Sequence, residues 1–277
     1  MQVNDDFLPL STLPASLHTA TQSAWKRLRE ALAQADNVAE MTKQELPSSN
    51  WQGLSEQRRE ALAKVLTIST FALDTLVRYP QWLAELDIAG ELDVNPGRDE
   101  LASWLSESLE SAEDEEAMQR VIRRFRRKRM LGIIWRDLNR ASGHSMWSTA
   151  TAVSELAEIC LEAALTWLER FYAPRWGLPA PRKDGTPQRL VILGMGKLGA
   201  GELNLSSDID LIFAFPEKGE TQGGRKPLEH QEYFTKLAKA DCRPGCHDRR
   251  WLRLPCRYAL AAFGRRRAAG GLFCHAL

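Results

Sequence analysis

Apolar residues recur every three to four positions along most of the first 173 residues, which is the spacing of one face of an α-helix. This pattern predicts helices over Glu60–Leu83, Leu101–Leu109, Glu115–Leu138 and Thr151–Tyr172. Pro80 interrupts the first of them, because proline lacks the amide hydrogen that a helix interior needs. We therefore expect residues 1–173 to form an all-helical region, with tryptophans such as Trp25 and Trp147 as core anchors.

The pattern changes at residues 174–187, which hold four prolines and two glycines among charged side chains. This composition favours a linker or a domain boundary. Beyond it, short apolar runs predict buried strands at Arg189–Leu193 and Ile209–Phe215. A short helix is expected at Gly199–Leu205 and a longer one from His230 to Ala240. The predicted fold class is α+β: a helical region, a linker, the start of an α/β core with a mixed sheet at 188–239, and a tail of different character at 240–277.

Composition and charge exclude several classes of protein. The 37 lysines and arginines balance 36 aspartates and glutamates, so no global field favours nucleic acid or an anionic membrane. The segment Met1–Leu10 contains Asp5 and Asp6 but no basic residue, which is unlike a signal peptide. No apolar run reaches the roughly 20 residues that cross a bilayer. We expect a cytoplasmic protein that binds neither membrane nor nucleic acid.

The basic run Arg123–Arg129 is a pattern also found in nucleic-acid-binding segments. However, Ile122 and Phe125 recur with Trp135 at positions that suit the buried side of a helix. We interpret the run as the solvated face of this helix, with arginines that pair with Glu113–Glu116 or with a neighbouring element.

The segment from Leu193 to Phe213 carries the candidate chemistry. A strand leads into a glycine turn, and a polar turn, Ser206-Ser207, then delivers Asp208 and Asp210 onto a second strand. Residues two apart on a strand share a face, so the two carboxylates point the same way. Hard oxygen ligands of this kind suit Mg²⁺. Glycines let backbone amides approach phosphate closely, so the pattern predicts metal-assisted nucleotidyl or phosphoryl transfer.

Two features of this segment leave alternatives open. Gly194, Gly196 and Gly199 also satisfy the dinucleotide fingerprint Gly-x-Gly-x-x-Gly, but that interpretation leaves the two aspartates unexplained and needs a longer first helix. The hydroxyls of Ser206 and Ser207 either donate to phosphate or cap the turn, and the sequence favours neither role.

A small-residue turn followed by Asp-x-Asp on a strand resembles the DNA polymerase β-like nucleotidyltransferase superfamily. The turn maps to Gly196 and Lys197, although the superfamily usually has Gly or Ser at the lysine position. Within it, Gly-Met-Gly-Lys-Leu-Gly (194–199) and Glu-Leu-Asn-Leu-Ser-Ser-Asp-Ile-Asp-Leu-Ile-Phe (202–213) resemble the glutamine synthetase adenylyltransferase family. The segments Leu76–Pro80 and Arg123–Leu138 are also similar to it, and the resemblance covers roughly residues 50 to 239.

That family carries two such domains in one long chain. The resemblance implies that the N-terminal one removes AMP from an adenylylated tyrosine of glutamine synthetase by phosphorolysis, giving ADP, and that the C-terminal one adds AMP from ATP. The helical region places this chain at the N-terminal half. By the resemblance, Asp208 and Asp210 are catalytic ligands of Mg²⁺. The nucleotide and phosphate would be held by Gly194, Gly196, Lys197 and Ser207.

The implied partners are glutamine synthetase, ATP or ADP, phosphate and the PII signal protein. Two alternatives remain. A PII-protein uridylyltransferase shares Gly-Glu-Leu and Ser-Asp-Ile-Asp, although the glycine turn and the helical region argue against it. A non-catalytic module could dock on glutamine synthetase through the same helices.

The tail Asp241–Leu277 holds four cysteines and many arginines, without a convincing helix or strand period. A zinc site from Cys242, Cys246, His247 and Cys256 does not fit the usual two-plus-two spacing. Plausible codons for Arg253–Ala262, read one nucleotide later, give Ala-Tyr-Arg-Val-Asp-Met-Arg-Leu-Arg-Pro, and the family carries its third catalytic carboxylate on such a strand. We therefore expect a frameshift near Lys239, a missing third strand, and a fragment with little or no activity.

Overall fold

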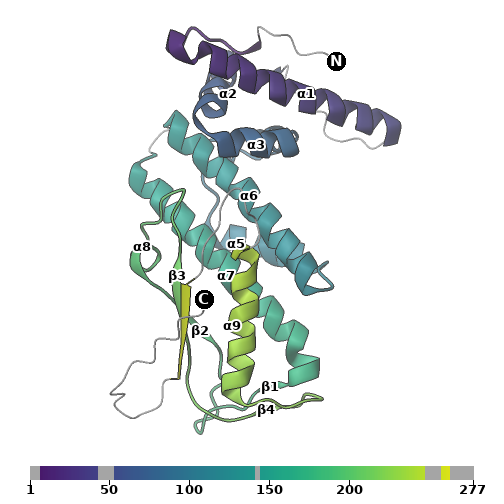
Figure 1. Cartoon of the computed structure of the whole chain (residues 1–277), viewed down its shortest axis with the longest axis vertical. Coiled ribbons are helices and arrows are strands. Elements are labelled where there is room, and N and C mark those ends of the chain that lie inside the picture. The colour runs from purple at the N-terminus through teal and green to yellow at the C-terminus, as the bar shows by residue number, and fades with distance from the viewer. Residues whose placement is uncertain (1–6, 43–52, 141–143, 247–256, 263–277) are drawn as a thin grey trace. The chain divides into compact units, whose positions relative to one another are not determined.

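The computed structural model describes residues 7–42, 53–140, 144–246 and 257–262. Their contacts define two compact units, one from Met1–Gly97 with Arg126–Ala152 and one from Arg98–Phe125 with Val153–Leu277. Two long helices, α6 (Glu115–Asn139) and α7 (Met146–Trp176), each contribute to both units (Figure 1). The predicted domain boundaries at 174–187 and 240 stay predictions. None of the helices in these described ranges is long and apolar enough to cross a membrane.

The first unit is built on helices around a leucine-rich core. After a 3-10 turn at Ala15–Leu17 come α1 (His18–Thr42), α2 (Glu56–Ile68), α3 (Thr70–Arg78) and α4 (Trp82–Ile88). Their buried side chains include Trp25, Leu28, Leu62, Leu76, Trp82 and Leu86. Trp25 is therefore a core anchor, as expected. The same prediction is wrong for Trp147, which is 62% exposed.

The helix predicted over Glu60–Leu83 breaks twice rather than once. Besides the break at Pro80, the chain leaves the helix at Ser69, whose backbone is extended (φ −113°, ψ 102°). The Ser69 hydroxyl accepts a hydrogen bond from the amide of Ala72 at 3.2 Å and so caps α3. Serine competes with helix continuation in this way, which the apolar periodicity does not register.

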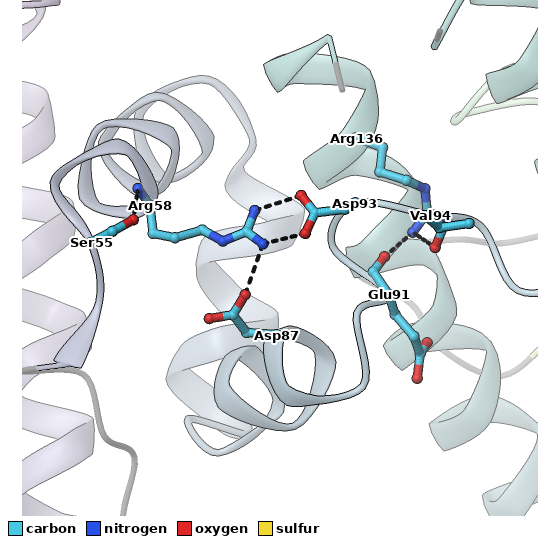
Figure 2. A network of polar contacts seen from close by, with 7 residues as sticks. All are labelled: Ser55, Arg58, Asp87, Glu91, Asp93, Val94 and Arg136. Carbon is cyan, nitrogen blue, oxygen red and sulfur yellow. Dashed lines mark hydrogen bonds and ion pairs between the residues drawn. The ribbon is translucent and has the colours of Figure 1, made fainter. Parts of the chain in front are cut away.

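The basic run on α6 pairs with acidic neighbours, which confirms the expected pairing with a neighbouring element. The expected solvated face is wrong, because Arg124 is the only exposed residue of Arg123–Arg129. Lys128 contacts Glu85 of α4 at 2.5 Å, and Arg129 pairs with Glu91. Further along α6, the buried guanidinium of Arg136 donates to the carbonyl oxygen of Glu91 (Figure 2). It also donates to the side chain of Asn95 at 2.6 Å. Burial lowers the pKa of Arg136 to about 10.

The second unit contains α5 (Arg98–Leu109), α9 (His230–Cys246) and two small sheets. In one sheet, β1 (Leu178–Pro179) pairs with β4 (Thr221–Gln222). In the other, β2 (Val191–Gly194) is antiparallel to β3 (Asp210–Phe215), and β3 is parallel to β5 (Arg257–Ala262). The predicted α+β class with a mixed sheet is therefore confirmed.

The strand β5 corrects one expectation. The tail was predicted to lack a strand, yet residues 257–262 pair with the whole length of β3, so that position 257 lies opposite Asp210. The free edge of a strand presents unpaired amide and carbonyl groups, and a short segment without proline or glycine can pair with them through its backbone alone. The postulated zinc ligands are not described: His247 and Cys256 lie outside the described residues, as do the side chains of Cys242 and Cys246.

Two helix boundaries also differ from the prediction. The helix expected at Gly199–Leu205 is instead the single turn α8 (Gly196–Gly199), after which Gly201 adopts a positive φ of +70°. The helix α7 continues past Pro174 to Trp176, into the predicted linker. Proline lacks the amide hydrogen that would bond four residues back, so α7 loses one hydrogen bond at Pro174 and ends two residues later.

Candidate functional site

The candidate site lies on the β2–β3 hairpin, where α8 and a polar loop join the two strands. The amide of Met195 donates to the carbonyl oxygen of Asp210 at 2.8 Å, which closes the hairpin at this end. Since β2 and β3 are antiparallel, the dinucleotide-fold interpretation is excluded, because its first two strands must be parallel.

The glycine turn is tight because the backbone of Gly199 closely approaches that of Gly194. A Cβ atom on Gly199 would lie 2.4 Å from the carbonyl oxygen of Gly194, a contact that side chains do not tolerate. Gly196 has φ +55°, in the left-handed region that glycine adopts without strain. The sequence therefore needs glycine at both positions to fold the chain back onto β3. The proposed phosphate contacts of Gly194 and Gly196 stay predictions.

The polar loop between α8 and β3 is ordered by the side chain of Asn204. Its Oδ1 accepts hydrogen bonds from the Ser206 amide at 3.1 Å and the Ser207 hydroxyl at 2.8 Å. The backbone amide of Asn204 in turn donates to Ser207 Oγ at 3.0 Å. In this structure the two serines thus cap the turn, one of the two roles that the sequence left open. A phosphate contact from Ser207 stays a prediction.

Asp208 and Asp210 both lie exposed, while Ile209 and Leu211 between and after them are buried. The alternation places the two carboxylates on the open side of the hairpin, as the strand period indicates. Met195 directly follows β2, pairs with Asp210 and is also exposed, so the open side combines carboxylates with an apolar edge.

The electrostatics of the site leave the two carboxylates uncompensated. Within the described ranges, neither aspartate has an ion-pair partner and no group of three or more His, Cys, Asp or Glu residues could hold a metal. Mg²⁺ is bound in proteins through one or two carboxylates together with water and substrate phosphates. Asp208 and Asp210 therefore fit this ion as a two-ligand site. Lys197 is exposed on α8 and supplies a positive charge close in sequence to the two aspartates.

Helix α7 supports the hairpin at both ends. The guanidinium of Arg189, just before β2, donates to Glu169 at 2.9 Å and to Thr166 at 2.7 Å. Near the other end, the amide of Leu203 donates to Ser154 Oγ at 3.1 Å. The sequence reasoning missed these residues. An asparagine before two serines is a known turn signal and would have identified Asn204, whereas a serine within a long helix gives no such signal.

On the opposite side of the sheet, β3 packs on α9. The rings of Phe215 and Phe234 stack with centroids 5.0 Å apart, and Phe213 is fully buried. This apolar contact covers the face of β3 that carries Phe213 and Phe215, whereas Asp210 lies on the other face.

The fold and site define an α+β protein in which a glycine turn sets two carboxylates on the open face of a mixed sheet. The family model described as glutamate-ammonia ligase adenylyltransferase matches residues 59–240. The chain therefore belongs to the glutamate-ammonia ligase adenylyltransferase family. The match ends at residue 240, where the predicted tail begins.

Two similar proteins are each named bifunctional glutamine synthetase adenylyltransferase/adenylyl-removing enzyme. The one from Pseudomonas aeruginosa is 43% identical over 230 residues, or 83% of this chain and 22% of the relative. The one from Pseudomonas syringae pv. tomato is 41% identical over 191 residues, or 69% of this chain and 19% of the relative. The chain thus spans about a fifth of the length of the curated relatives it matches.

Proposed function

We propose that this chain carries part of a Mg²⁺-dependent nucleotidyl-transfer site of the adenylyl-removing type, acting on an adenylylated tyrosine of glutamine synthetase. The observation that carries the proposal is the pair of exposed, unpaired carboxylates, Asp208 and Asp210, beside a glycine turn. The names of the two relatives and the family membership supply the substrate. Glutamine synthetase, ATP or ADP, phosphate and a PII protein are the proposed partners, in the cytoplasm.

The reaction balances as a phosphorolysis. An oxygen of inorganic phosphate forms a bond to the phosphorus of the tyrosine-linked AMP, and the bond from that phosphorus to the tyrosine oxygen breaks. The phenolic oxygen takes a proton from the attacking phosphate, which leaves free tyrosine and ADP. A bound Mg²⁺ supplies charge neutralisation for the phosphoryl oxygens.

The residues of this chain would act by binding and orientation. Asp208 and Asp210 hold the cation on the open side of the hairpin. The backbone amides at Gly194 and Gly196 approach the phosphates, and the ammonium of Lys197 offsets their negative charge. Ser207 keeps the loop in shape through Asn204 and offers its hydroxyl at the loop surface.

We further propose that the 277-residue chain has little or no catalytic activity, because the described site provides two carboxylates and no third. The register of β5 places Arg257 opposite Asp210. With the plausible codons used above, reading one nucleotide later places an aspartate at this position. We infer that the shifted frame would supply the third carboxylate that this frame lacks.

The test uses Mn²⁺ as a spectroscopic substitute for Mg²⁺, titrated into the whole chain and followed by electron paramagnetic resonance. Asp208→Asn and Asp210→Asn should each weaken Mn²⁺ binding by roughly tenfold, or about 1.4 kcal/mol. Glu217→Gln, an exposed carboxylate beyond the other end of β3, is the matched control and should leave binding unchanged. Equal affinity in all four proteins would show that the carboxylates hold no cation.

Activity is tested separately by incubating the chain with adenylylated glutamine synthetase, phosphate and Mg²⁺ and measuring ADP. We expect no release above the Asp208→Asn background. Robust phosphorolysis would contradict the proposed inactivity, while leaving the proposed chemistry intact. Stable docking on glutamine synthetase without turnover would support the second candidate role, a non-catalytic binding module.

A further inference from the structure

One buried hydrogen bond joins the candidate site to a helix distant in sequence. The amide of Leu203 donates to Ser154 Oγ at 3.1 Å, across 49 positions of the chain. Ser154 is 2% exposed and Leu203 is 1% exposed, so water cannot replace either partner. A buried amide without an acceptor is costly, and this bond therefore fixes where the loop begins.

From Leu203 the constraint passes directly into the loop that carries the carboxylates. The next residue, Asn204, binds the Ser206 amide and the Ser207 hydroxyl through its side chain. Asp208 follows immediately, and buried Ile209 then enters β3. The loop is thus anchored at its start by Ser154 and at its end by the sheet, with Asn204 holding the turn between them.

We propose that Ser154 is a positioning residue for Asp208 and Asp210, an inference that rests on the proposed function of these two carboxylates. Its hydroxyl holds the loop in the position from which the side chains of Asp208 and Asp210 reach one cation. Without the acceptor, the loop start is released from α7 and the two carboxylates lose their common geometry. The expected effect is about a tenfold weaker cation affinity, the low end of what outer contacts of metal sites contribute.

The experiment compares Ser154→Thr with Ser154→Val in the whole 277-residue chain. The two new side chains have the same shape, so their difference isolates the hydroxyl acceptor. The valine variant should bind Mn²⁺ about tenfold more weakly than the threonine variant. Amide hydrogen exchange supplies a readout without metal: exchange at residues 203–208 should accelerate in the valine variant only.

Thr221→Val provides the matched control for general loss of stability. Thr221 is as buried as Ser154, lies in the same unit, and its hydroxyl accepts a hydrogen bond from the amide of Leu228 at 2.9 Å. However, it follows the end of β3 that is farthest from Asp210. This variant should lower the melting temperature without changing Mn²⁺ affinity. If Thr221→Val and Ser154→Val weaken Mn²⁺ binding equally, the effect is general and the positioning role is wrong.

Asp208→Asn separates the two proposals. Loss of Mn²⁺ binding in Asp208→Asn together with normal binding in Ser154→Val would overturn the positioning role alone. Unchanged Mn²⁺ binding in Asp208→Asn would overturn both the cation site and the positioning role that depends on it.

Discussion

Arg58 and Asp93 meet through two parallel hydrogen bonds, from Nη1 to Oδ1 at 2.9 Å and from Nη2 to Oδ2 at 2.5 Å (Figure 2). The same guanidinium lies 2.9 Å from a carboxylate oxygen of Asp87. One arginine of α2 thereby links the last turn of α4 to the loop that follows it. Lysine cannot reproduce this planar, two-point contact, so the position is specific for arginine.

Replacing Arg58 should therefore destabilise the first unit measurably. Because Asp93 is largely exposed, we expect Arg58→Ala to lower the free energy of unfolding by only about 0.5–1 kcal/mol, and Arg58→Lys to recover little of it. Urea denaturation measures this difference. Arg27→Ala is the control, since Arg27 makes one exposed contact with Asp74. A larger loss in Arg27→Ala than in Arg58→Ala would contradict the prediction.

The pH dependence of the Arg58 contact has a defined sign. The hydrogen bond from Arg58 lowers the pKa of Asp93 below its ordinary value of 3.8. The stabilisation is therefore present above pH 3.8 and is lost as the pH falls through the lowered pKa of the folded state. The difference in stability between wild type and Arg58→Ala should shrink in this acidic range and stay constant near neutrality.

His144 should make the first unit less stable in mild acid. Its Nε2 lies 2.8 Å from Thr149 Oγ1, and Thr149 donates to Asp137, so His144 is the donor in the first contact. Partial burial, then the charge of Arg136, lower the pKa of His144 below 6.5, and Asp137 opposes them. The neutral ring is favoured in the folded state, so stability is full above pH 6.5 and falls as the pH drops below it.

Melting temperatures at pH 7.5 and 5.5 test this prediction against His144→Gln, which keeps a donor but does not titrate. The wild type should lose more stability between the two pH values than the variant. An equal loss in both proteins would show that other groups cause the acid sensitivity.

Gly199→Ala should open the glycine turn. The added Cβ would lie 2.4 Å from the Gly194 carbonyl oxygen, and relieving such a clash typically costs about 1–3 kcal/mol of stability. Thermal denaturation measures the loss, and Mn²⁺ affinity should fall with it because the turn feeds the loop of Asp208. Gly97→Ala, where the new methyl meets nothing within 4 Å, is the control and should be close to neutral.

The nucleotide sequence across codons 236–280 should contain a second open frame. Read one nucleotide later, it should encode Val-Asp-Met-Arg-Leu-Arg-Pro at positions 256–262. The structure sharpens this expectation, because β5 aligns position 257, aspartate in the shifted frame, with Asp210. Stop codons in that frame would refute the frameshift and leave the third carboxylate to another segment.

Several features of this protein could be predicted from sequence because they depend on near neighbours. The helices at 98–109 and 115–139 follow from apolar residues on one face, and their predicted bounds differ from the structure by at most three residues. The hairpin strand at Asp210–Phe215 follows from its apolar run. The break at Ser69 and the single turn at Gly196–Gly199 were missed, since capping and glycine geometry outweigh periodicity there.

The sequence by itself determined the local chemistry: a glycine turn, an Asn-directed polar loop, and two aspartates that share a face because strand side chains alternate. Only the tertiary structure decided which distant residues support them. Ser154 meets Leu203, Arg189 meets α7 and β5 adds to β3 through contacts whose partners are separated by tens of residues. Such contacts depend on how the chain folds back on itself, and no periodicity along the chain encodes them.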